Sequence, residues 1–449
     1  MNYEAKVKEL CEGKKAFIRT FGCQLNENDS EKLAGMLQTM GYVISDDIRT
    51  ADLVLLNTCA IRENAEKKTF GAVGLLKNLK EKNPALIVVM AGCMTGETHV
   101  MDKLRATYCH VDIVLGSNNI DAFPRLLYTY LYEKERVFDT EYAGVLPEGL
   151  PTYRQDKFRA SVPVMYGCNN FCAYCIVPYV RGRERSRKAA DIVREVETLR
   201  DNGYMEVMLL GQNVNSYQGG GDAFARLLQQ VSDTGIPRIR FMTSHPKDIS
   251  DAVLDVMASR DNICKALHLP VQAGNNRVLA AMNRRYTREK YLSIVEKARE
   301  KMPDIVLTTD IIVGFPGETN EEFADTISLL KAVRYDMIFS FIFSPRQGTP
   351  AANMADVLTA EEKKRNFDQL LQVQNQISKE KNLQLADKIL PVLVEGRSKT
   401  DATMMTGRTD GGKIVHFKGD DGLCGRIVDV QIQTPKTWNL QGEIVCHSN

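Results

Sequence analysis

Three cysteines each follow a short apolar run that has the character of a buried strand. The runs AFIRTFGC, LVLLNTC and LIVVMAGC end at Cys23, Cys59 and Cys93. Consecutive cysteines are separated by about one βαβ repeat, which takes roughly 30 residues or more. Because the carboxyl ends of parallel strands share one edge of a sheet, the three thiols can meet there. Residues 14–132 therefore predict an N-terminal open parallel α/β domain with a metal site at its edge.

Two kinds of metal centre could occupy that site. Three thiolates can bind zinc with an outside fourth ligand, or three irons of a 4Fe-4S cluster. The chain has 11 cysteines among 449 residues, an odd number in a long chain. A disulfide framework is typical of small chains with even counts, so metal or redox chemistry is the better interpretation.

The rest of the chain divides by its periodicity. Residues 133–156 lose the pattern and contain Gly and Pro, as in a linker. Residues 157–385 hold six apolar runs, five of them followed by a helical pattern, which predicts a partial, open (β/α)6 barrel. Residues 386–449 contain short strands separated by Gly- and Asp-containing turns, which indicates a small antiparallel β-barrel.

A second cysteine set opens the central barrel. The segment CNNFCAYC places Cys168, Cys172 and Cys175 in a CxxxCxxC loop after the first barrel strand. Three close thiolates can hold three irons of a 4Fe-4S cluster and leave the fourth iron open to a small molecule. A structural zinc would want a fourth protein ligand nearby, and the loop offers none.

This loop, at the start of a six-unit barrel, resembles that of the radical S-adenosylmethionine (SAM) superfamily. The resemblance implies that SAM binds the open iron and is split by one electron to a 5′-deoxyadenosyl radical. It places Tyr174 against the adenine and Gln212 and Asn213, in LLGQNVNSY, at the methionine part of SAM. Gly314, in IIVGFPGE, lies on the strand that would back the adenosine.

The whole chain resembles the MiaB-type tRNA methylthiotransferases. Shared motifs run from residue 22 to residue 319: GCQLNENDS, NTCAIRENAEKK, GCNNFCAYCIVPYVRGRERSR, LGQNVNSY, RFMTSHPKD, LHLPVQAGNNRVL and GFPGET. Leu25 and Val180 depart from the usual motifs, and neither is a predicted ligand. The resemblance implies an auxiliary 4Fe-4S cluster on Cys23, Cys59 and Cys93, besides the radical SAM cluster, and a C-terminal TRAM domain that binds RNA.

The same resemblance implies the reaction. One SAM would donate a methyl group to sulfur, a second would supply the radical, and a methylthio group would enter C2 of N6-isopentenyladenosine at tRNA position 37. The C2–H bond is not acidic and C2 carries no leaving group, so radical chemistry suits this task better than acid–base catalysis. The expected partners are a tRNA anticodon stem-loop that carries isopentenyladenosine and an electron donor such as flavodoxin or ferredoxin.

Two alternatives stay open. A sister methylthiotransferase would act on threonylcarbamoyl-adenosine in tRNA or on an aspartate of a ribosomal protein. A protein of another class, a non-catalytic RNA-binding protein, would use the two cysteine sets for structural zinc.

Candidate RNA contacts are basic side chains near the radical loop and in the C-terminal barrel: Arg181, Arg183, Arg185, Arg408, Lys413 and Lys418. His416, Phe417 and Trp438 are aromatic candidates in the same barrel. The formal net charge is only +1, so RNA binding must be local. No apolar run is long enough to span a bilayer, and we expect a cytoplasmic monomer that does not bind membranes.

Overall fold

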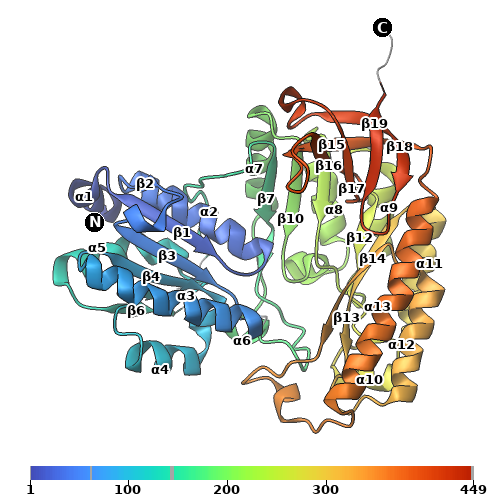
Figure 1. Ribbon diagram of the computed structural model, residues 1–449, viewed down its shortest axis with the longest axis horizontal. Coiled ribbons are helices and arrows are strands. Elements are labelled where there is room, and N and C mark those ends of the chain that lie inside the picture. The colour runs from blue at the N-terminus through green and yellow to red at the C-terminus, as the bar shows by residue number, and fades with distance from the viewer. Residues whose placement is uncertain (1, 61–62, 142–145, 446–449) are drawn as a thin grey trace. The chain divides into compact units, whose positions relative to one another are not determined.

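The computed structural model describes residues 2–60, 63–141 and 146–445, and the chain forms two compact units (Figure 1). Unit 1 comprises Met1–Asp156, Met165–Phe171 and Cys175–Arg187. Unit 2 comprises Lys157–Val164, Cys172–Tyr174 and Lys188–Asn449. The chain therefore changes units within the CxxxCxxC loop, which a division by sequence alone treats as one segment.

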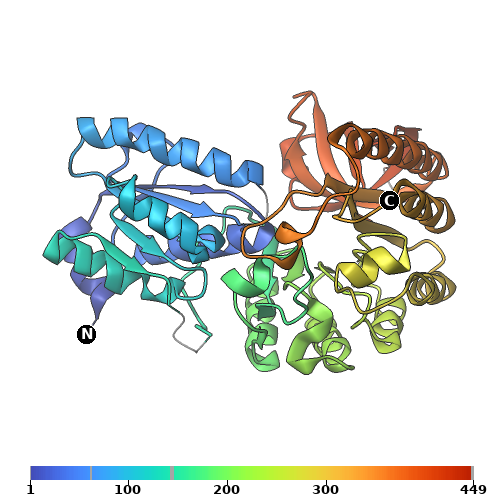
Figure 2. The same ribbon diagram turned by 90° about the horizontal axis from the view of Figure 1, so that it is seen from below.

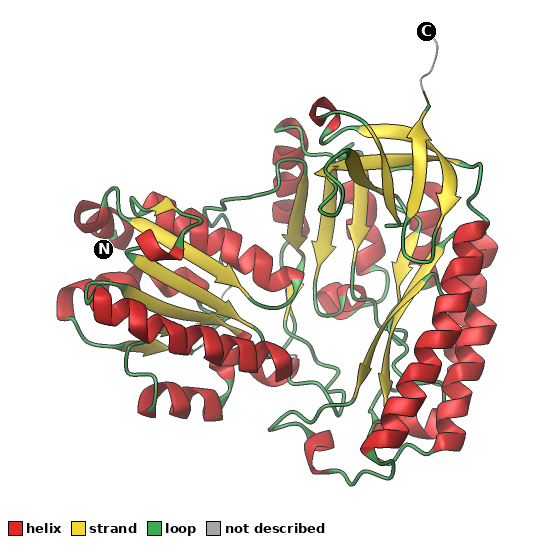
Figure 3. Cartoon of the chain, viewed as in Figure 1, coloured by secondary structure: helices red, strands yellow, loops and turns green. Residues whose placement is uncertain are grey.

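Unit 1 is built on a six-stranded sheet in the order β2-β1-β3-β4-β5-β6, in which every pairing is parallel. The strands are β1 Lys15–Thr20, β2 Val43–Ile44, β3 Leu53–Thr58, β4 Ile87–Gly92, β5 Ile113–Leu115 and β6 Val137–Asp139. The helices are α1 Tyr3–Cys11, α2 Gln24–Thr39, α3 Glu63–Lys82, α4 Thr98–Ala106, α5 Phe123–Glu133 and the short α6 Val177–Val180. The small strands β8 Met165–Tyr166 and β9 Arg185–Ser186 pair with each other. Figure 3 shows the helices packed along the strands of this sheet.

Strand β3 illustrates why the predicted strands read as almost continuous apolar runs. Leu53 and Leu55 belong to one hydrophobic core, which includes residues of α1, α2 and α5. Val54 and Leu56 point the other way, into a core with residues of α3 and α4. Both faces of the sheet are buried, so successive residues of one strand are all apolar. The predicted parallel α/β domain is confirmed.

Strand β6 lies in the stretch 133–156 that the sequence indicated as linker. It pairs with β5 in parallel, and Arg136 just before it donates to the carbonyls of Val111 and Leu104, both at 2.8 Å. A strand of three residues carries too little periodicity to be seen in the sequence, so its pairing depends on tertiary contacts.

Unit 2 contains the predicted open barrel as two parallel three-stranded sheets, ordered β11-β10-β7 and β12-β13-β14. A parallel bridge between Ile239 and Ile263 links β11 to the segment before β12. The strands are β7 Arg159–Pro163, β10 Glu206–Leu210, β11 Arg238–Phe241, β12 Ala266–His268, β13 Val306–Val313 and β14 Met337–Ile342. The helices are α7 Ala189–Asp201, α8 Ala223–Asp233, α9 Asp251–Ser259, α10 Asn276–Ala281, α11 Arg288–Lys301, α12 Asn320–Val333 and α13 Ala360–Leu383. Figure 2 shows these helices around the strands of unit 2.

The C-terminal region is a closed barrel in the order β15-β16-β17-β19-β18. Its strands are β15 Ile389–Arg397, β16 Met404–Thr409, β17 Ile414–Lys418, β18 Ile427–Pro435 and β19 Leu440–Ile444. Val394, Met405 and Phe417 are among the residues that fill its core. The predicted small β-barrel is confirmed, and its pairings are antiparallel except that of β17 with β19, which is parallel.

Candidate cluster, SAM and RNA sites

The N-terminal cysteines follow three strands of the unit 1 sheet. Cys23 precedes α2 as its N-cap, after β1. Cys59 follows β3, and Cys93 begins a 3₁₀ turn directly after β4. Cys59 and Cys93 are buried, whereas Cys23 is exposed. The predicted placement at strand ends therefore holds for all three thiols.

Asn26 and Gly22 lie beside the three thiols. The Asn26 Oδ1 atom lies 3.4 Å from Cys23 Sγ and 3.8 Å from Cys93 Sγ. A Cβ atom added at Gly22 would lie 2.6 Å from Cys59 Cβ and 3.0 Å from Cys59 Sγ, so glycine leaves the room that Cys59 needs. The three cysteines therefore gather around the start of α2.

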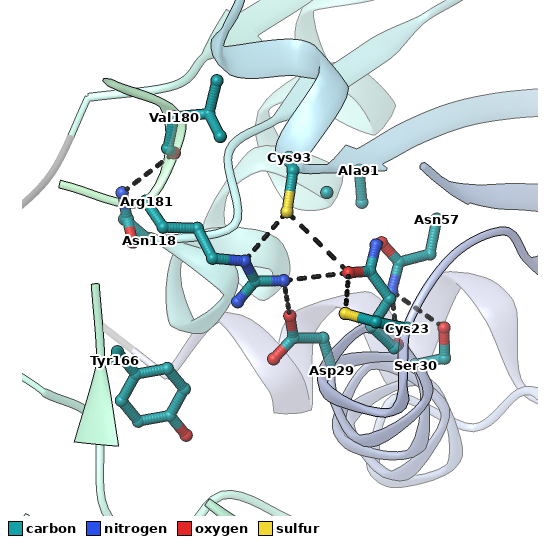
Figure 4. A network of polar contacts seen from close by, with 12 residues as sticks. Cys23, Asp29, Ser30, Asn57, Ala91, Cys93, Asn118, Tyr166, Val180 and Arg181 are labelled. Atoms are coloured by element: carbon teal, nitrogen blue, oxygen red, sulfur yellow. Dashed lines mark hydrogen bonds and ion pairs between the residues drawn. The ribbon is translucent and has the colours of Figure 1, made fainter. Parts of the chain in front are cut away.

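A buried arginine lies among these groups. Arg181 Nε donates to Cys93 Sγ at 2.8 Å, and Nη2 donates to Asp29 and Asn26, both at 3.0 Å. Figure 4 shows the guanidinium between Cys93 and Asp29. Burial raises the pKa of Cys93 to about 12, although Arg181 opposes this shift. Burial by itself would lower the pKa of Arg181, but Cys93 and Asp29 raise it above its usual value.

The second cysteine set is divided between the units. Cys168 and Cys175 belong to unit 1, and Cys172 belongs to unit 2 with Tyr174. In unit 1 the Cys168 amide donates to the Gly182 carbonyl at 3.1 Å. Gly167 has φ +75°, and a Cβ there would lie 2.1 Å from the Arg183 carbonyl oxygen, so this close approach requires glycine.

In unit 2 a second buried arginine accompanies Cys172. Arg284 Nη1 lies 3.5 Å from Cys172 Sγ and 3.4 Å from the Tyr174 hydroxyl. Its Nε donates to the Tyr286 hydroxyl at 3.1 Å, and its Nη2 donates to the Pro270 carbonyl at 2.6 Å. From the sequence, Arg284, Arg285 and Arg288 form a second, weaker candidate for RNA contact, for which a solvent-facing charge is the better interpretation, but Arg284 is buried. Nothing in its local pattern distinguishes it from Arg285.

The donor chemistry at both sets fits iron–sulfur clusters. Within the described residues, no three His, Cys, Asp or Glu side chains are grouped so that they could hold a metal ion. A cluster spreads its thiolate ligands over several irons, so its ligands need not converge on one point. Each set offers three thiols, and a buried guanidinium donates to one thiol of each set, which suits an anionic thiolate-ligated group.

Unpartnered polar atoms follow two strands of the unit 2 barrel. Gln212 Oε1 and Asn213 Oδ1, after β10, are buried without a hydrogen-bond partner among the described residues. Ser244 Oγ and His245 Nε2, after β11, share this property. Buried polar atoms are normally satisfied, so these atoms are available to a polar ligand such as SAM. Ser244 and His245 were not predicted, although the polar run SHPKD at the end of a barrel strand is a usable signal.

Gly314 lies in a tight turn after β13. Its φ is +69°, its amide donates to Glu318 at 2.6 Å, and a Cβ there would lie 2.5 Å from Lys363. Burial raises the pKa of Glu318 to about 7, although the amides of Gly314 and Phe315 oppose this. The turn alone explains why glycine is needed here.

The predicted RNA contacts differ in their surroundings. Arg181 is 2% exposed, and this burial does not fit the prediction that it contacts RNA. Arg183 is exposed and lies over the Phe171 ring at 4.5 Å, while Arg185 donates to Asn118 at 2.8 Å.

In the C-terminal barrel, Arg408 pairs with Glu395 at 2.9 Å, and Lys413 pairs with Asp336 at 2.9 Å. Lys418 is exposed, and Trp438 is 58% exposed, although a lone Trp is more often packed. Phe417 fills the core, and His416 shares a 2.7 Å hydrogen bond with Thr406. Lys418 and Trp438 are therefore the most accessible of these candidates.

Three family models match the chain. The radical SAM superfamily matches residues 162–330, the uncharacterized protein family UPF0004 matches residues 15–116, and the TRAM domain matches residues 387–445. Together with the fold, these matches define a radical SAM enzyme with an N-terminal α/β domain and a TRAM barrel. Such an enzyme takes SAM and a 4Fe-4S cluster.

Relatives match the chain from end to end. A tRNA-2-methylthio-N(6)-dimethylallyladenosine synthase from Acetivibrio thermocellus is 51% identical over 99% of this chain and 94% of its own length. One from Thermoanaerobacter sp. (strain X514) is 49% identical over 98% of this chain and 96% of its own length. The chain belongs to this family of tRNA-2-methylthio-N(6)-dimethylallyladenosine synthases.

Solved structures support the fold alone. The radical SAM methyltransferase TsrM from Kitasatospora setae aligns with a TM-score of 0.57 at 15% identity, over 76% of this chain and 75% of its own. The cobalamin-dependent radical enzyme OxsB aligns with a TM-score of 0.55 at 11% identity, over 82% of this chain and 62% of its own. In the part of the chain that the structure describes, no helix has the length and apolar character to cross a bilayer.

Proposed function

We propose that this chain adds a methylthio group to C2 of N6-isopentenyladenosine at position 37 of tRNA. The observation that carries the proposal is the 51% identity, over 99% of the chain, to a synthase named for this product. The predicted sister activities and the non-catalytic RNA-binding alternative have no observation in their favour. The predicted domains 14–132, 157–385 and 386–449 would carry the auxiliary cluster, the radical chemistry and RNA binding.

Two 4Fe-4S clusters are part of the proposal. Cys23, Cys59 and Cys93 would hold the auxiliary cluster, and Cys168, Cys172 and Cys175 would hold the radical cluster. When bound, the radical cluster and one equivalent of SAM would supply the radical, and a second equivalent of SAM would supply the methyl group for sulfur held at the auxiliary cluster. An electron donor such as flavodoxin or ferredoxin would reduce the clusters of a cytoplasmic monomer.

The protein's own residues would bind and orient these groups. Gln212, Asn213, Ser244 and His245 offer buried polar atoms to SAM after β10 and β11. Arg284 donates to the Tyr174 hydroxyl and so restrains the ring that the family resemblance places at the adenine. The Tyr286 hydroxyl donates to the Val271 carbonyl at 2.7 Å and accepts from Arg284, which holds the guanidinium in place.

The accessible candidates for RNA are Lys418 and Trp438 in the barrel and Arg183 after the radical loop. An exposed tryptophan can stack on an unpaired base, and an exposed lysine can contact phosphate. Asn382 donates to the carbonyls of Lys436 and Thr437 at 2.8 and 3.1 Å, which fixes the loop that carries Trp438.

The test measures whether the chain forms methylthiolated isopentenyladenosine in RNA. Anaerobically purified, iron-reconstituted protein is incubated with SAM, a reductant and an isopentenylated anticodon stem-loop, and the digested RNA is analysed by mass spectrometry. We expect a methylthio group on isopentenyladenosine and none on the matched stem-loop without the isopentenyl group. If 5′-deoxyadenosine forms and only a threonylcarbamoyl-adenosine stem-loop is modified, the proposed substrate is wrong.

A further inference from the structure

Arg181 keeps one donor unused beside the N-terminal thiols. Its Nε and Nη2 atoms are engaged by Cys93, Asn26 and Asp29, but Nη1 is buried without a partner among the described residues. The Oδ1 atom of Asp29 is likewise buried without a partner. A guanidinium with a free donor and a thiol within hydrogen-bond distance is suited to a further anionic ligand.

The segment that carries Arg181 is packed against the same thiols. Ile176, the N-cap of α6, and Val180, the last residue of α6, form a small hydrophobic core with Ala60 and Cys93. A Cβ added at Gly96 would lie 3.2 Å from Val180 Cα, so the backbone of α6 lies close to the turn that begins at Cys93.

The same segment is also tied to the radical loop. The Cys168 amide donates to the Gly182 carbonyl, one residue after Arg181. Cys175 directly precedes the Ile176–Arg181 stretch. All of these residues belong to unit 1. The unit 1 residues of this short stretch therefore include two cysteines of the radical set and the arginine that touches the auxiliary set.

We propose that Arg181 is a positioning residue for sulfur insertion. It anchors the stretch after the radical loop to the auxiliary thiols and supplies the buried positive charge that a thiolate-ligated cluster on Cys23, Cys59 and Cys93 requires. This inference rests on the proposed function, because it needs a cluster at those thiols. It also explains why a basic side chain next to the radical loop is buried rather than exposed to RNA.

The test isolates the auxiliary cluster. In the full-length chain, Cys168, Cys172 and Cys175 are changed to Ala, and the midpoint potential of the remaining cluster is measured by an EPR-monitored redox titration. Arg181→Met is compared with Arg181→Lys, and Arg183→Met is the matched control from the same segment. Because a cation stabilises the reduced, more negative cluster, Arg181→Met should lower the potential. The ratio of reduced to oxidised cluster at a fixed potential should fall about tenfold or more.

The lysine variant should recover part of that shift, and the Arg183→Met control should keep the parental potential. A parental potential in Arg181→Met would overturn the inference. Loss of folding is handled by the double variant Asp29→Asn, Arg181→Met, in which no buried carboxylate is left without its cation. That variant should fold, as judged by circular dichroism, and should have a lower potential than Asp29→Asn alone, so equal potentials in these two variants overturn the inference as well.

The chain that carries only the three Cys→Ala changes, called the parent here, tells a failure of the role of Arg181 from a failure of the proposed auxiliary cluster. A cluster in the parent with no effect of Arg181 means that the auxiliary site stands and the role of Arg181 fails. A parent that binds no iron under reconstitution means that the auxiliary site itself is wrong, and the role of Arg181 falls with it.

Discussion

Arg181 and Arg284 are both buried, and each donates to a cysteine thiol, but the charge of their other partners differs. Arg181 pairs with the carboxylate of Asp29. The partners that the described residues supply to Arg284 are two tyrosine hydroxyls, a thiol and a carbonyl, all uncharged. The auxiliary thiols thus face a balanced ion pair, whereas Cys172 faces an unbalanced positive charge.

The difference indicates two distinct uses of a buried cation. A buried ion pair holds its geometry, and in this pair it is the guanidinium that contacts Cys93, while the carboxylate of Asp29 is bound at Nη2. A buried cation with neutral partners is costly in an empty site and favourable once an anionic group arrives. A thiolate-ligated cluster is anionic, so a cluster held by Cys172 would supply the negative charge that Arg284 lacks among its own partners.

The largest expected effect separates the two cysteine sets. Changing Cys168, Cys172 or Cys175 to Ala should abolish both 5′-deoxyadenosine formation and methylthiolation, because the radical cannot form. Changing Cys23, Cys59 or Cys93 to Ala should abolish methylthiolation but leave some SAM cleavage. Both products are measured by mass spectrometry in the same reaction, with Cys109→Ala, an exposed cysteine outside both sets, as the control. Methylthiolation retained by a variant of the N-terminal set would contradict its cluster role.

The free energy of unfolding tests whether the two arginines differ in the charge of their partners. Arg181→Met leaves Asp29 as an unpaired buried charge, which should cost about 3–5 kcal/mol of unfolding free energy. Arg284→Met leaves neutral acceptors unpaired, at about 1–3 kcal/mol, but also removes the cost of a buried cation without a counter-charge, so its net cost should be smaller than that of Arg181→Met. Denaturant unfolding of the iron-free full chain measures both, and the exposed Arg285→Met should stay within about 0.5 kcal/mol of the parent.

If Arg284→Met destabilises the chain as much as Arg181→Met does, the two buried arginines do not differ in the way that their partners indicate. The comparison is sharpened by Asp29→Asn in the Arg181→Met background. That second change should restore part of the lost stability, since it removes the uncompensated charge.

A pH dependence follows from the positive charge of Arg284. Burial, and then repulsion from Arg284, lowers the pKa of His245 from 6.5 to about 2. Below pH 6.5, His245 binds a proton in the unfolded chain but stays neutral in the folded chain. Its contribution to the free energy of unfolding therefore falls as pH falls. The loss should be about 1.4 kcal/mol per pH unit.

His245→Gln should remove that part of the slope between about pH 4 and pH 6, measured as the difference from the parent in denaturant unfolding. Arg284→Met should raise the pKa of His245 and make the slope shallower at the acid end. Parallel curves for the parent and His245→Gln would show that His245 is not held neutral.

The smallest expected effect concerns RNA binding, and it compares a lysine that is paired with a carboxylate with an exposed lysine. Lys413 is paired with Asp336, and Lys418 is exposed. Lys418→Ala should reduce the salt dependence of stem-loop binding by about one phosphate contact, and Lys413→Ala should leave it unchanged. Fluorescence anisotropy titrations at several salt concentrations measure both slopes, and equal changes would mean that the ion pair does not withhold Lys413 from RNA.

Much of this protein is readable from its sequence. The apolar runs before Cys23, Cys59 and Cys93 have the length and composition of strands buried on both faces, and the folded sheet has them in parallel order. The CxxxCxxC loop and the short C-terminal strands are equally local signals. The three-residue strand β6 and the buried polar atoms of Ser244 and His245 were missed, because pairing and burial are not properties of a local pattern.

Local chemistry and periodicity thus predicted the parallel sheet, the barrels and the two cysteine sets, and the resemblance of the motifs identified the family. Arg181 and Arg284 could not be ranked in this way, since a charged run such as RGRERSR or NRRY looks the same whether its members are buried or solvated. Arg181 lies 88 residues from Cys93 and 152 from Asp29 along the chain, and only folding brings these charges together. The burial of a charge is decided by distant partners, and those partners determine whether an arginine supports a cluster or is available to RNA.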